Sequence, residues 1–359
     1  NQPPLFQKQD SEVVLQVCAV GLNFRDILNV LGEYPGDPGP PGGDVAAVVK
    51  DADPQTVYWT GDSIIGLSHA PLASMSRATA SLLVPKPAQL GFEEACTLPV
   101  TWSTAHVALE RAALHATRPI VVQAAAGGVG LKAVEYSQWL STPLLGTAGR
   151  PHKHVQLRGL GVKVLCSSRN AEAQTTGVAK LLMAGRTHAV LNSLSLDFIA
   201  VMMSALKENG AFEEIGKRGI WAPTRQQVSA SAVKYSAIAL DADMTYDPEW
   251  MHSVFTALSR RASVGVAVGL PRRSFEMTTQ HALAFRMLQG GLNTGKVVMR
   301  IGIREGTGRR DAHRDAGGAR WDVEDGRSKL QMITGGLGGL GLVTARWLAQ
   351  RHKSALLLT

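Results

Sequence analysis

The 359-residue sequence has few cysteines, few aromatic residues and no long hydrophobic run. Its cysteines, Cys18, Cys96 and Cys166, lie far apart and form no C-x-x-C pair, which excludes a disulfide framework and a structural zinc site. No apolar run reaches the length of a membrane span, and the opening Asn-Gln-Pro-Pro lacks the charged-then-apolar pattern of a targeting leader. We therefore expect a protein of a reducing compartment, the cytoplasm, with no membrane partner.

Acidic residues are the minority among the charged side chains. The formal net charge is +8, yet no Lys/Arg-rich helix, aromatic platform or zinc-finger spacing accompanies it, so we do not expect nucleic-acid binding. An acidic partner or a phosphate-rich cofactor accounts for the positive charge. With 45% hydrophobic and 18% charged residues, the chain is long enough for two domains, each with its own core.

The most informative pattern is an apolar strand that runs into a glycine turn. Residues 120–124 precede this turn, and a helical pattern with Ala133 and Leu140 on its apolar face follows it. Glycines here let backbone N–H groups approach a pyrophosphate, and the helix N-terminus adds a partial positive charge. The pattern predicts a dinucleotide-binding loop; the alternative is an ordinary tight turn. The residues expected to contact the cofactor are Ala126, Gly127, Gly128, Val129 and Gly130.

The residues after the next predicted strand indicate which dinucleotide is bound. A site selective for NAD places Asp or Glu there to hold the ribose 2′-hydroxyl, whereas this sequence has Thr147 followed by Arg150 and Lys153. A small residue and then cations suit a 2′-phosphate, with Arg150 as a bidentate partner and Lys153 as a point charge. We therefore predict NADPH rather than NADH. The alternative for Arg150 and Lys153 is a solvated loop.

Changes in pattern divide the first 301 residues into three stretches. Residues 1–112, with short alternating runs between turn signals, predict a small β-rich domain. Residues 113–248 alternate strands with helical stretches, which predicts a parallel, doubly wound sheet. Residues 249–301 end in a strand-like run that we expect to return to the first domain. The strands of the parallel sheet are expected at residues 120–124, 143–147, 162–165, 189–192 and 210–215.

The last part of the chain has a different character. Residues 302–328 are rich in glycine and arginine and poor in apolar side chains, which predicts a flexible linker. Residues 329–359 then repeat the passage from strand to glycine turn to helix, with T-G-x-x-x-G-x-G spacing from Thr334 to Gly341. This spacing is typical of a second dinucleotide fold. Because the chain stops at Thr359, we expect that fold to be truncated.

Taken together, these residues resemble the enoyl reductase domain of a modular type I polyketide or fatty-acid synthase, followed by the start of a ketoreductase domain. Such reductases are zinc-free and belong with the medium-chain, quinone-oxidoreductase-like enzymes. The resemblance covers most of residues 13–301 and implies an α/β protein, with a GroES-like substrate domain beside a Rossmann domain. Its matching motifs agree in order and spacing, and they are Gly21-Leu22-Asn23-Phe24-Arg25-Asp26, Leu31-Gly32-Glu33-Tyr34-Pro35-Gly36, Gly61-Asp62, the residues 124–130, Gly146-Thr147-Ala148, Val190-Leu191-Asn192-Ser193-Leu194, Glu214-Ile215-Gly216-Lys217 and Gly295-Lys296-Val297-Val298.

The resemblance implies an NADPH-dependent reduction of the 2,3 double bond of an enoyl thioester on an acyl carrier protein. A hydride reaches the β-carbon, and the resulting enolate is protonated at the α-carbon. No metal is implied, and the implied partners are the carrier protein, the ketoreductase and other synthase domains. By position, Asn23 and Thr104 hold the nicotinamide end. The other implied cofactor residues are Thr147, Asn192, Ser193, Leu194, Gly216, Lys217 and Lys296.

The resemblance offers more than one proton donor. Tyr34 matches a tyrosine associated with stereochemical control, and its alternative role is packing. Lys153 matches a lysine proposed as donor, with Glu172 as its carboxylate partner; the alternative for that pair is a surface salt bridge. The chain departs from the family pattern at Gln123, where histidine is usual, and at Ala47, where glycine is usual. These departures leave open a catalytically silent scaffold, and the fold leaves open a free-standing NADPH:quinone or alkenal reductase.

Overall fold

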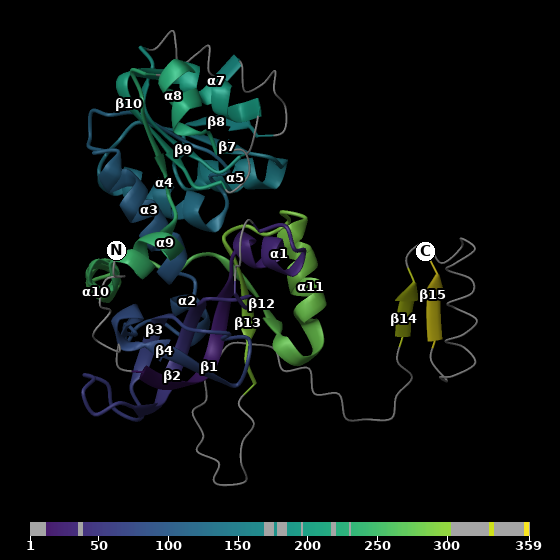
Figure 1. Cartoon of the computed structure of the whole chain (residues 1–359). Coiled ribbons are helices and arrows are strands. Elements are labelled where there is room, and N and C mark those ends of the chain that lie inside the picture. Colours follow the sequence, from purple (N-terminus) through teal and green to yellow (C-terminus); the bar gives the residue numbers. More distant parts are fainter. Residues whose placement is uncertain are drawn as a thin grey trace. The chain divides into compact units, whose positions relative to one another are not determined.

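The computed structural model describes residues 12–34, 39–168, 176–177, 185–194, 197–216, 220–229, 231–302, 330–333 and 355–358. The chain divides into two compact units, residues 1–304 and residues 305–359. The first unit contains two β-sheets with helices around them (Figure 1). Within the described residues, no helix is both long and apolar enough to cross a membrane.

The first sheet is mainly antiparallel. Its strand order is β12-β13-β1-β2-β3-β5, and β4 also pairs with β1. The strands are β1 (Glu12–Leu22), β2 (Asp44–Ala52), β3 (Ser63–Leu67), β4 (Met75–Thr79), β5 (Leu83–Pro85), β12 (Arg272–Glu276) and β13 (Lys296–Arg300). Side chains alternate between buried and partly exposed along the first half of β1, because one face of the strand lies on a core that includes Leu15, Val45 and Ile64. Strands β12 and β13, which come from the later part of the chain, form the edge of this sheet next to β1.

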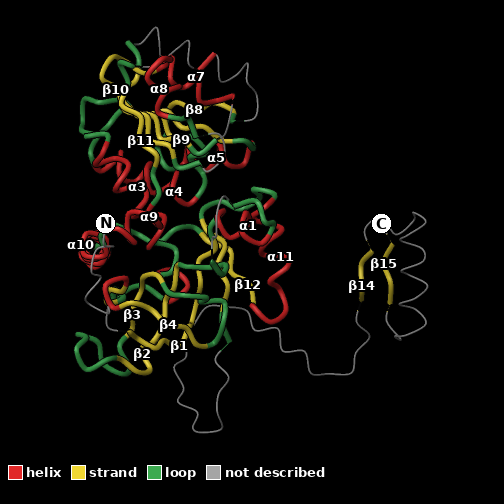
Figure 2. The backbone as a smooth tube through the Cα atoms, viewed as in Figure 1, coloured by secondary structure: helices red, strands yellow, loops and turns green. Residues whose placement is uncertain are grey.

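The second sheet is entirely parallel, with the order β11-β10-β9-β6-β7-β8. Figure 2 shows its strands, in yellow, with helices on their flanks. Its strands are β6 (Ile120–Val122), β7 (Leu144–Ala148), β8 (Val164–Ser167), β9 (Thr187–Asn192), β10 (Leu206–Glu214) and β11 (Lys234–Ala237). From the centre the chain builds outward through β7 and β8, then crosses to β9 on the other side. Ligands bind outside the carboxyl ends of strands at such a reversal of order, here between β6 and β9.

This arrangement confirms the predicted fold class, a β-rich sheet combined with a doubly wound nucleotide-binding sheet. The five expected parallel strands are present within a few residues of their predicted positions. The sixth strand, β11, was not expected, because Lys234-Tyr235-Ser236-Ala237 is short and half polar. The domain boundaries at residues 112, 248 and 301 remain predictions.

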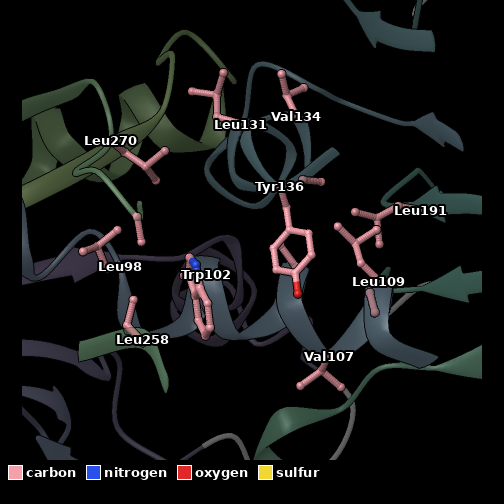
Figure 3. Packing of buried hydrophobic residues seen from close by; sticks show 14 of the residues in the cluster. Leu98, Trp102, Val107, Leu109, Leu131, Val134, Tyr136, Leu191, Leu258 and Leu270 are labelled. Atoms are coloured by element: carbon pink, nitrogen blue, oxygen red, sulfur yellow. The ribbon is translucent and has the colours of Figure 1, made fainter. Parts of the chain in front are cut away.

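Helices connect the two sheets and cover the core that the sheets share. Those of the nucleotide-binding half are α4 (Gly128–Trp139), α5 (Pro151–Gly159), α7 (Asp197–Ala205) and α8 (Pro223–Ser229), and the others are α1 (Phe24–Val30), α2 (Phe92–Ala95), α3 (Pro99–Arg111), α9 (Leu240–Tyr246), α10 (Pro248–Ser263), α11 (Met277–Gln289) and the short 3₁₀ helix Ala80–Leu82. Figure 3 shows Trp102 of α3 and Tyr136 of α4 within the largest core cluster. Leu258 of α10 joins the same cluster, so α3 is packed from both sides.

The second unit contributes one parallel pair of strands, β14 (Leu330–Ile333) and β15 (Ala355–Leu358). Parallel neighbours need a long crossover connection, as in the strand-helix-strand pattern predicted for residues 329–359. The predicted glycine turn from Thr334 to Gly341 and almost all of the predicted linker lie outside the described residues.

Candidate active site

The glycine loop between β6 and α4 has the geometry of a pyrophosphate cradle. Gly127 is the N-cap residue of α4, with φ −79° and ψ 174°. A Cβ at Gly130 would lie 2.5 Å from the carbonyl oxygen of Ala124, so this glycine lets helix and strand approach closely. A Cβ at Gly127 would meet only that same oxygen, at 3.3 Å, and would otherwise occupy the open side of the turn. The residues present therefore fit a dinucleotide pyrophosphate at the N-terminus of α4.

Gly128 faces a different neighbour from Gly127. A Cβ at Gly128 would lie 2.7 Å from Cγ2 of Thr101 on α3. Gly128 therefore permits close packing of α4 on α3. Thr104, one helical turn further along α3, is 7% exposed.

Two buried side chains, Gln123 and Thr147, support the glycine loop. The Thr147 hydroxyl donates to Oε1 of Gln123 at 2.6 Å and accepts from the backbone N–H of Ala124 at 3.1 Å. Ala124 has a φ of +47°, a strained value for a residue with a Cβ, and the bond to Thr147 helps hold it there. Within the described residues, the Nε2 of Gln123 has no hydrogen-bond partner although the side chain is only 2% exposed.

The carboxyl ends of β9 and β10 are joined by a polar contact that sequence reasoning missed. Asn192 is fully buried, and its Nδ2 donates to Oε2 of Glu214 at 2.7 Å and to the carbonyl of Leu194 at 2.6 Å. The other Glu214 oxygen accepts from the N–H of Gly216 at 2.6 Å. The Ser193 hydroxyl donates to the carbonyl of Gln123. Glu214 thus holds two of the predicted cofactor residues, Asn192 and Gly216, at the carboxyl ends of β9 and β10.

Arg150 and Lys153 lie where the 2′-phosphate was predicted, immediately after β7. Arg150 is the N-cap residue of α5, and its carbonyl accepts from the N–H of Lys153 at 3.1 Å. Lys153 Nζ donates to the carbonyl of Gly291 at 2.9 Å. The Nε of Arg150 is buried without a partner among the described residues.

A buried polar cluster lies where β1, β2, α3 and β13 meet. Lys296, 3% exposed, donates from Nζ to Oδ2 of Asp44 and to Oδ1 of Asn23, both at 2.6 Å. Asp44 is fully buried and also accepts from the N–H of Val100 at the start of α3. Asn23 and Lys296 were predicted from the sequence as site residues, whereas Asp44 was not. The signal that could have identified Asp44 is an acidic residue at the start of an apolar strand.

Comparisons with known proteins agree with this architecture. No protein-family model matches the chain. A phenolphthiocerol/phthiocerol polyketide synthase of Mycobacterium tuberculosis is 30% identical over 357 residues, which cover 98% of this chain and 16% of the synthase. The solved CurK enoyl reductase is 31% identical, with a TM-score of 0.75 over 84% of this chain and 94% of that one. The JamJ enoyl reductase is 27% identical, with a TM-score of 0.76 over 80% and 90%. The chain belongs to the polyketide synthase enoyl reductases.

Membership of the enoyl reductase family confirms the resemblance drawn from the motifs, and the glycine loop fits the nicotinamide dinucleotide that such a reductase uses. The chain spans about a sixth of the length of the synthase it matches. Two predicted site residues, Glu172 and Lys217, lie outside the described residues. The roles assigned to the individual site residues remain predictions.

Tyr34 has a partner that the sequence did not indicate. Its hydroxyl donates to Oδ2 of Asp241 on α9 at 2.6 Å, and the Arg25 guanidinium lies 5.3 Å from its ring centroid. Burial, together with the hydrogen bond and charge of Asp241, raises the pKa of Tyr34 to about 12. The phenol therefore keeps its proton throughout the neutral pH range.

Proposed function

We propose that this chain reduces the 2,3 double bond of an enoyl thioester on an acyl carrier protein, with NADPH as its cofactor. The observation that carries the proposal is the open side of the glycine loop at Gly127, in a chain of the enoyl reductase family. The loop lies at the reversal of strand order, where the crevice of a doubly wound sheet forms.

The charge at the start of α5 supports NADPH rather than NADH. A helix N-terminus carries a partial positive charge, so cations there are unfavourable unless an anion offsets them. The first turn of α5 has no acidic residue, and its N-cap residue is Arg150, whose buried Nε has no partner among the described residues. A 2′-phosphate dianion next to Arg150 would pair with the guanidinium and relieve this repulsion.

The reaction requires the chain to orient two reactants, exclude water and stabilise an oxyanion. NADPH, when bound, supplies the hydride that reduces the β-carbon. Gly127 and the N-terminus of α4 hold the pyrophosphate, and Asn192 and Ser193 shape the crevice beside it. The buried Gln123–Thr147 pair keeps the loop in its strained conformation while substrates enter and leave.

Protonation of the α-carbon completes the reduction, and Tyr34 and Lys153 are the proposed donors. Donation from Tyr34 would leave a phenolate 2.6 Å from the Asp241 carboxylate, which opposes that step. Donation from Lys153 would leave a neutral amine that still contacts the carbonyl of Gly291. The carboxylate beside Tyr34 thus opposes donation from the phenol, which favours Lys153 as the acid and Tyr34 as a group that orients the substrate.

The partners of the chain follow from the same proposal. The matched relative is a multidomain synthase, so the chain works beside other synthase domains. The acyl carrier protein is the proposed carrier of the substrate, and residues 329–359 are the proposed beginning of a ketoreductase domain in the same polypeptide.

Purified protein, NADPH and a crotonyl thioester test the proposal. We expect loss of the absorbance of the reduced cofactor when the thioester is added. A preference for quinones would support a free-standing quinone reductase instead. Cofactor binding without oxidation by either substrate would support a catalytically silent scaffold.

A pair of glycine variants tests where the cofactor binds. Gly127→Ala adds a methyl group on the open side of the loop and should weaken NADPH binding about tenfold or more. Gly91→Ala is the matched control, because Gly91 is also a helix N-cap residue, with φ −69° and ψ 160°, and a Cβ there meets nothing within 4 Å. Equal affinities in both variants would show that the pyrophosphate binds elsewhere.

A further inference from the structure

Lys296 is a buried lysine at the junction between the first sheet and the glycine loop. The residue before it, Gly295, donates its N–H to the carbonyl of Ala126 in the loop at 3.0 Å, and Gly295 and Gly127 form an isolated parallel bridge. Gly295 has a φ of +67°, and a Cβ there would lie 2.0 Å from the carbonyl oxygen of Pro271, so the approach of this segment requires glycine. The start of β13 is therefore attached directly to the predicted pyrophosphate loop.

The Lys296 ammonium is bonded to residues at the ends of β1 and β2 in the first sheet. Its Nζ donates to Asp44 Oδ2 and Asn23 Oδ1, both at 2.6 Å, and the side chain is 3% exposed. Gly21 on β1 leaves room for the lysine stem, because a Cβ there would lie 2.8 Å from Lys296 Cε. Two of the three ammonium donors are thus used inside the protein, and burial shields the group from a cofactor phosphate.

Both the oxygen and the nitrogen of the Asn23 side-chain amide make hydrogen bonds. Its Oδ1 accepts from Lys296, and its Nδ2 donates to Asp44 Oδ2 at 3.0 Å. The Asn23 backbone N–H is fixed as well, by Oδ2 of Asp26 at 2.7 Å. The capping box of α1 also pairs the Asn23 side chain with the backbone N–H of Asp26. An amide nitrogen donates two hydrogen bonds, so Asn23 keeps one N–H donor. Unlike Lys296 and Asp44, Asn23 is partly exposed.

We propose that Lys296 and Asp44 are positioning residues that orient the Asn23 amide toward the carboxamide of the bound nicotinamide, and that Lys296 does not bind the cofactor phosphates. The inference rests on the proposed function. A carboxamide carries an acceptor oxygen, which complements the one N–H donor that Asn23 has left. Because β13 is attached to the pyrophosphate loop through Gly295, the same segment sets both the loop and the amide.

A purely structural salt bridge makes a different prediction. A buried ion pair often contributes little net stability compared with apolar residues of the same size, and breaking it leaves an uncompensated charge. A structural pair would change the stability of the protein and leave the relative affinity for cofactor fragments unchanged. A positioning pair would change the affinity for ligands that contain the nicotinamide and spare ligands that lack it.

The test compares binding of NADPH with binding of 2′-phospho-ADP-ribose, which keeps the adenine, ribose and phosphate groups but lacks the nicotinamide. Both dissociation constants are measured by calorimetry, without catalysis. We expect Lys296→Met to weaken NADPH about tenfold and to leave 2′-phospho-ADP-ribose within about twofold of the wild type. Asn23→Ala should show the same selective loss, and the double variant should bind NADPH no more weakly than Asn23→Ala alone, because both changes remove one interaction.

Lys132→Met is the matched control. Lys132 is a second buried lysine, 1% exposed, which pairs with Glu135 at 2.7 Å and also donates to the carbonyl of Val268. Its replacement should lower the melting temperature without changing the ratio of the two affinities. If Lys296→Met does not fold, Asp44→Asn keeps the size of the side chain, and Asn23→Ala tests the amide directly.

Each outcome decides the inference. Equal weakening of both ligands in Lys296→Met would make Lys296 a phosphate ligand, and unchanged NADPH affinity would make the pair structural; either result overturns the proposal. If the wild-type protein binds NADPH no more tightly than 2′-phospho-ADP-ribose, the nicotinamide adds nothing to the affinity, and the proposal is overturned. Failure of the proposed function is seen separately, as a wild type that binds neither ligand or does not oxidise NADPH with the enoyl thioester.

Discussion

Tyr34 donates a 2.6 Å hydrogen bond to Asp241, a residue 207 positions later in the sequence. Asp241 lies on α9, whose other acidic residue, Asp243, pairs with Arg111 of α3 at 2.9 Å. The short helix α9 is thus bonded on one side to the loop after α1 and on the other to the end of α3. The two aspartates differ in partner but share a helix, so they form a matched pair for mutagenesis.

Asp241→Asn should lower the pKa of Tyr34 from about 12 towards its usual value, because the carboxylate that disfavours the phenolate is removed. Asp243→Asn should leave it unchanged. The measurement is a titration of tyrosinate absorbance, with Tyr34→Phe subtracted; the sequence has only five tyrosines. The same shift in both variants would contradict the assignment.

The raised pKa of Tyr34 also makes the stability of the protein depend on pH. A group with a higher pKa in the folded state stabilises the fold below its unfolded pKa, and this contribution is lost as pH rises through the folded pKa. For Tyr34 the loss falls between about pH 10 and about 12. We expect a smaller loss in this interval for Tyr34→Phe, measured as melting temperature against pH.

Glu213→Gln should stabilise the protein at alkaline pH. Glu213 is 1% exposed, both of its carboxyl oxygens lack partners among the described residues, and burial raises its pKa to about 7 although Lys234 and Arg111 oppose the shift. Stability is therefore present below the unfolded pKa, about 4.5, and falls as pH rises through about 7. Glutamine avoids the buried charge, so we expect a gain of about 1–3 kcal/mol at pH 8 and little below pH 5.

Urea unfolding at the two pH values checks the Glu213 prediction. Glu214→Gln is the neighbouring control on the opposite face of β10, where the carboxylate accepts from Asn192 and Gly216. That variant should lose stability. A gain in Glu214→Gln, or none in Glu213→Gln at pH 8, would count against the prediction.

Arg150→Ala should discriminate between cofactors. We expect NADPH to bind about tenfold more weakly and NADH to change little, because the 2′-phosphate is the only group that differs. Arg158→Ala, in the last turn of the same helix, is the control. Lys153→Ala should also weaken NADPH more than NADH if Lys153 contacts the phosphate, whereas equal weakening with a lower turnover would assign it to proton transfer.

Arg261→Met should destabilise the packing of α10 on the nucleotide-binding half. The Arg261 guanidinium lies 5.4, 5.2 and 4.9 Å from the ring centroids of Trp102, Tyr136 and Trp139. Such contacts contribute about 0.5–2 kcal/mol each where they are partly desolvated. Because one guanidinium serves all three rings, these contributions do not add, and we expect a total loss of about 1–2 kcal/mol in urea unfolding. Arg260→Met, an exposed neighbour on the same helix, should lose much less.

Features with short-range signals were predicted well. The passage from β6 through the glycine turn into α4 shows in the sequence because alternation of apolar residues, glycine in a turn and helical spacing all act within a few residues. Strand β11 was missed for the same reason, since its four residues carry no clear period and pair only because β10 lies beside them. Gly128 was grouped with the pyrophosphate glycines, and only the packing of α4 on Thr101 separates its role from that of Gly127.

The amino-acid sequence by itself determined the fold class, the position of the glycine loop between β6 and α4, and the enoyl reductase family, because each depends on local order and spacing. Only the tertiary structure decided which polar groups meet: Lys296 reaches Asn23 across 273 residues and Asp44 across 252, and Asp241 reaches Tyr34 across 207. A buried charge is stable only with partners, and here those partners are brought together by the pairing of β13, β1 and β2 and by the position of α9, which no local pattern encodes.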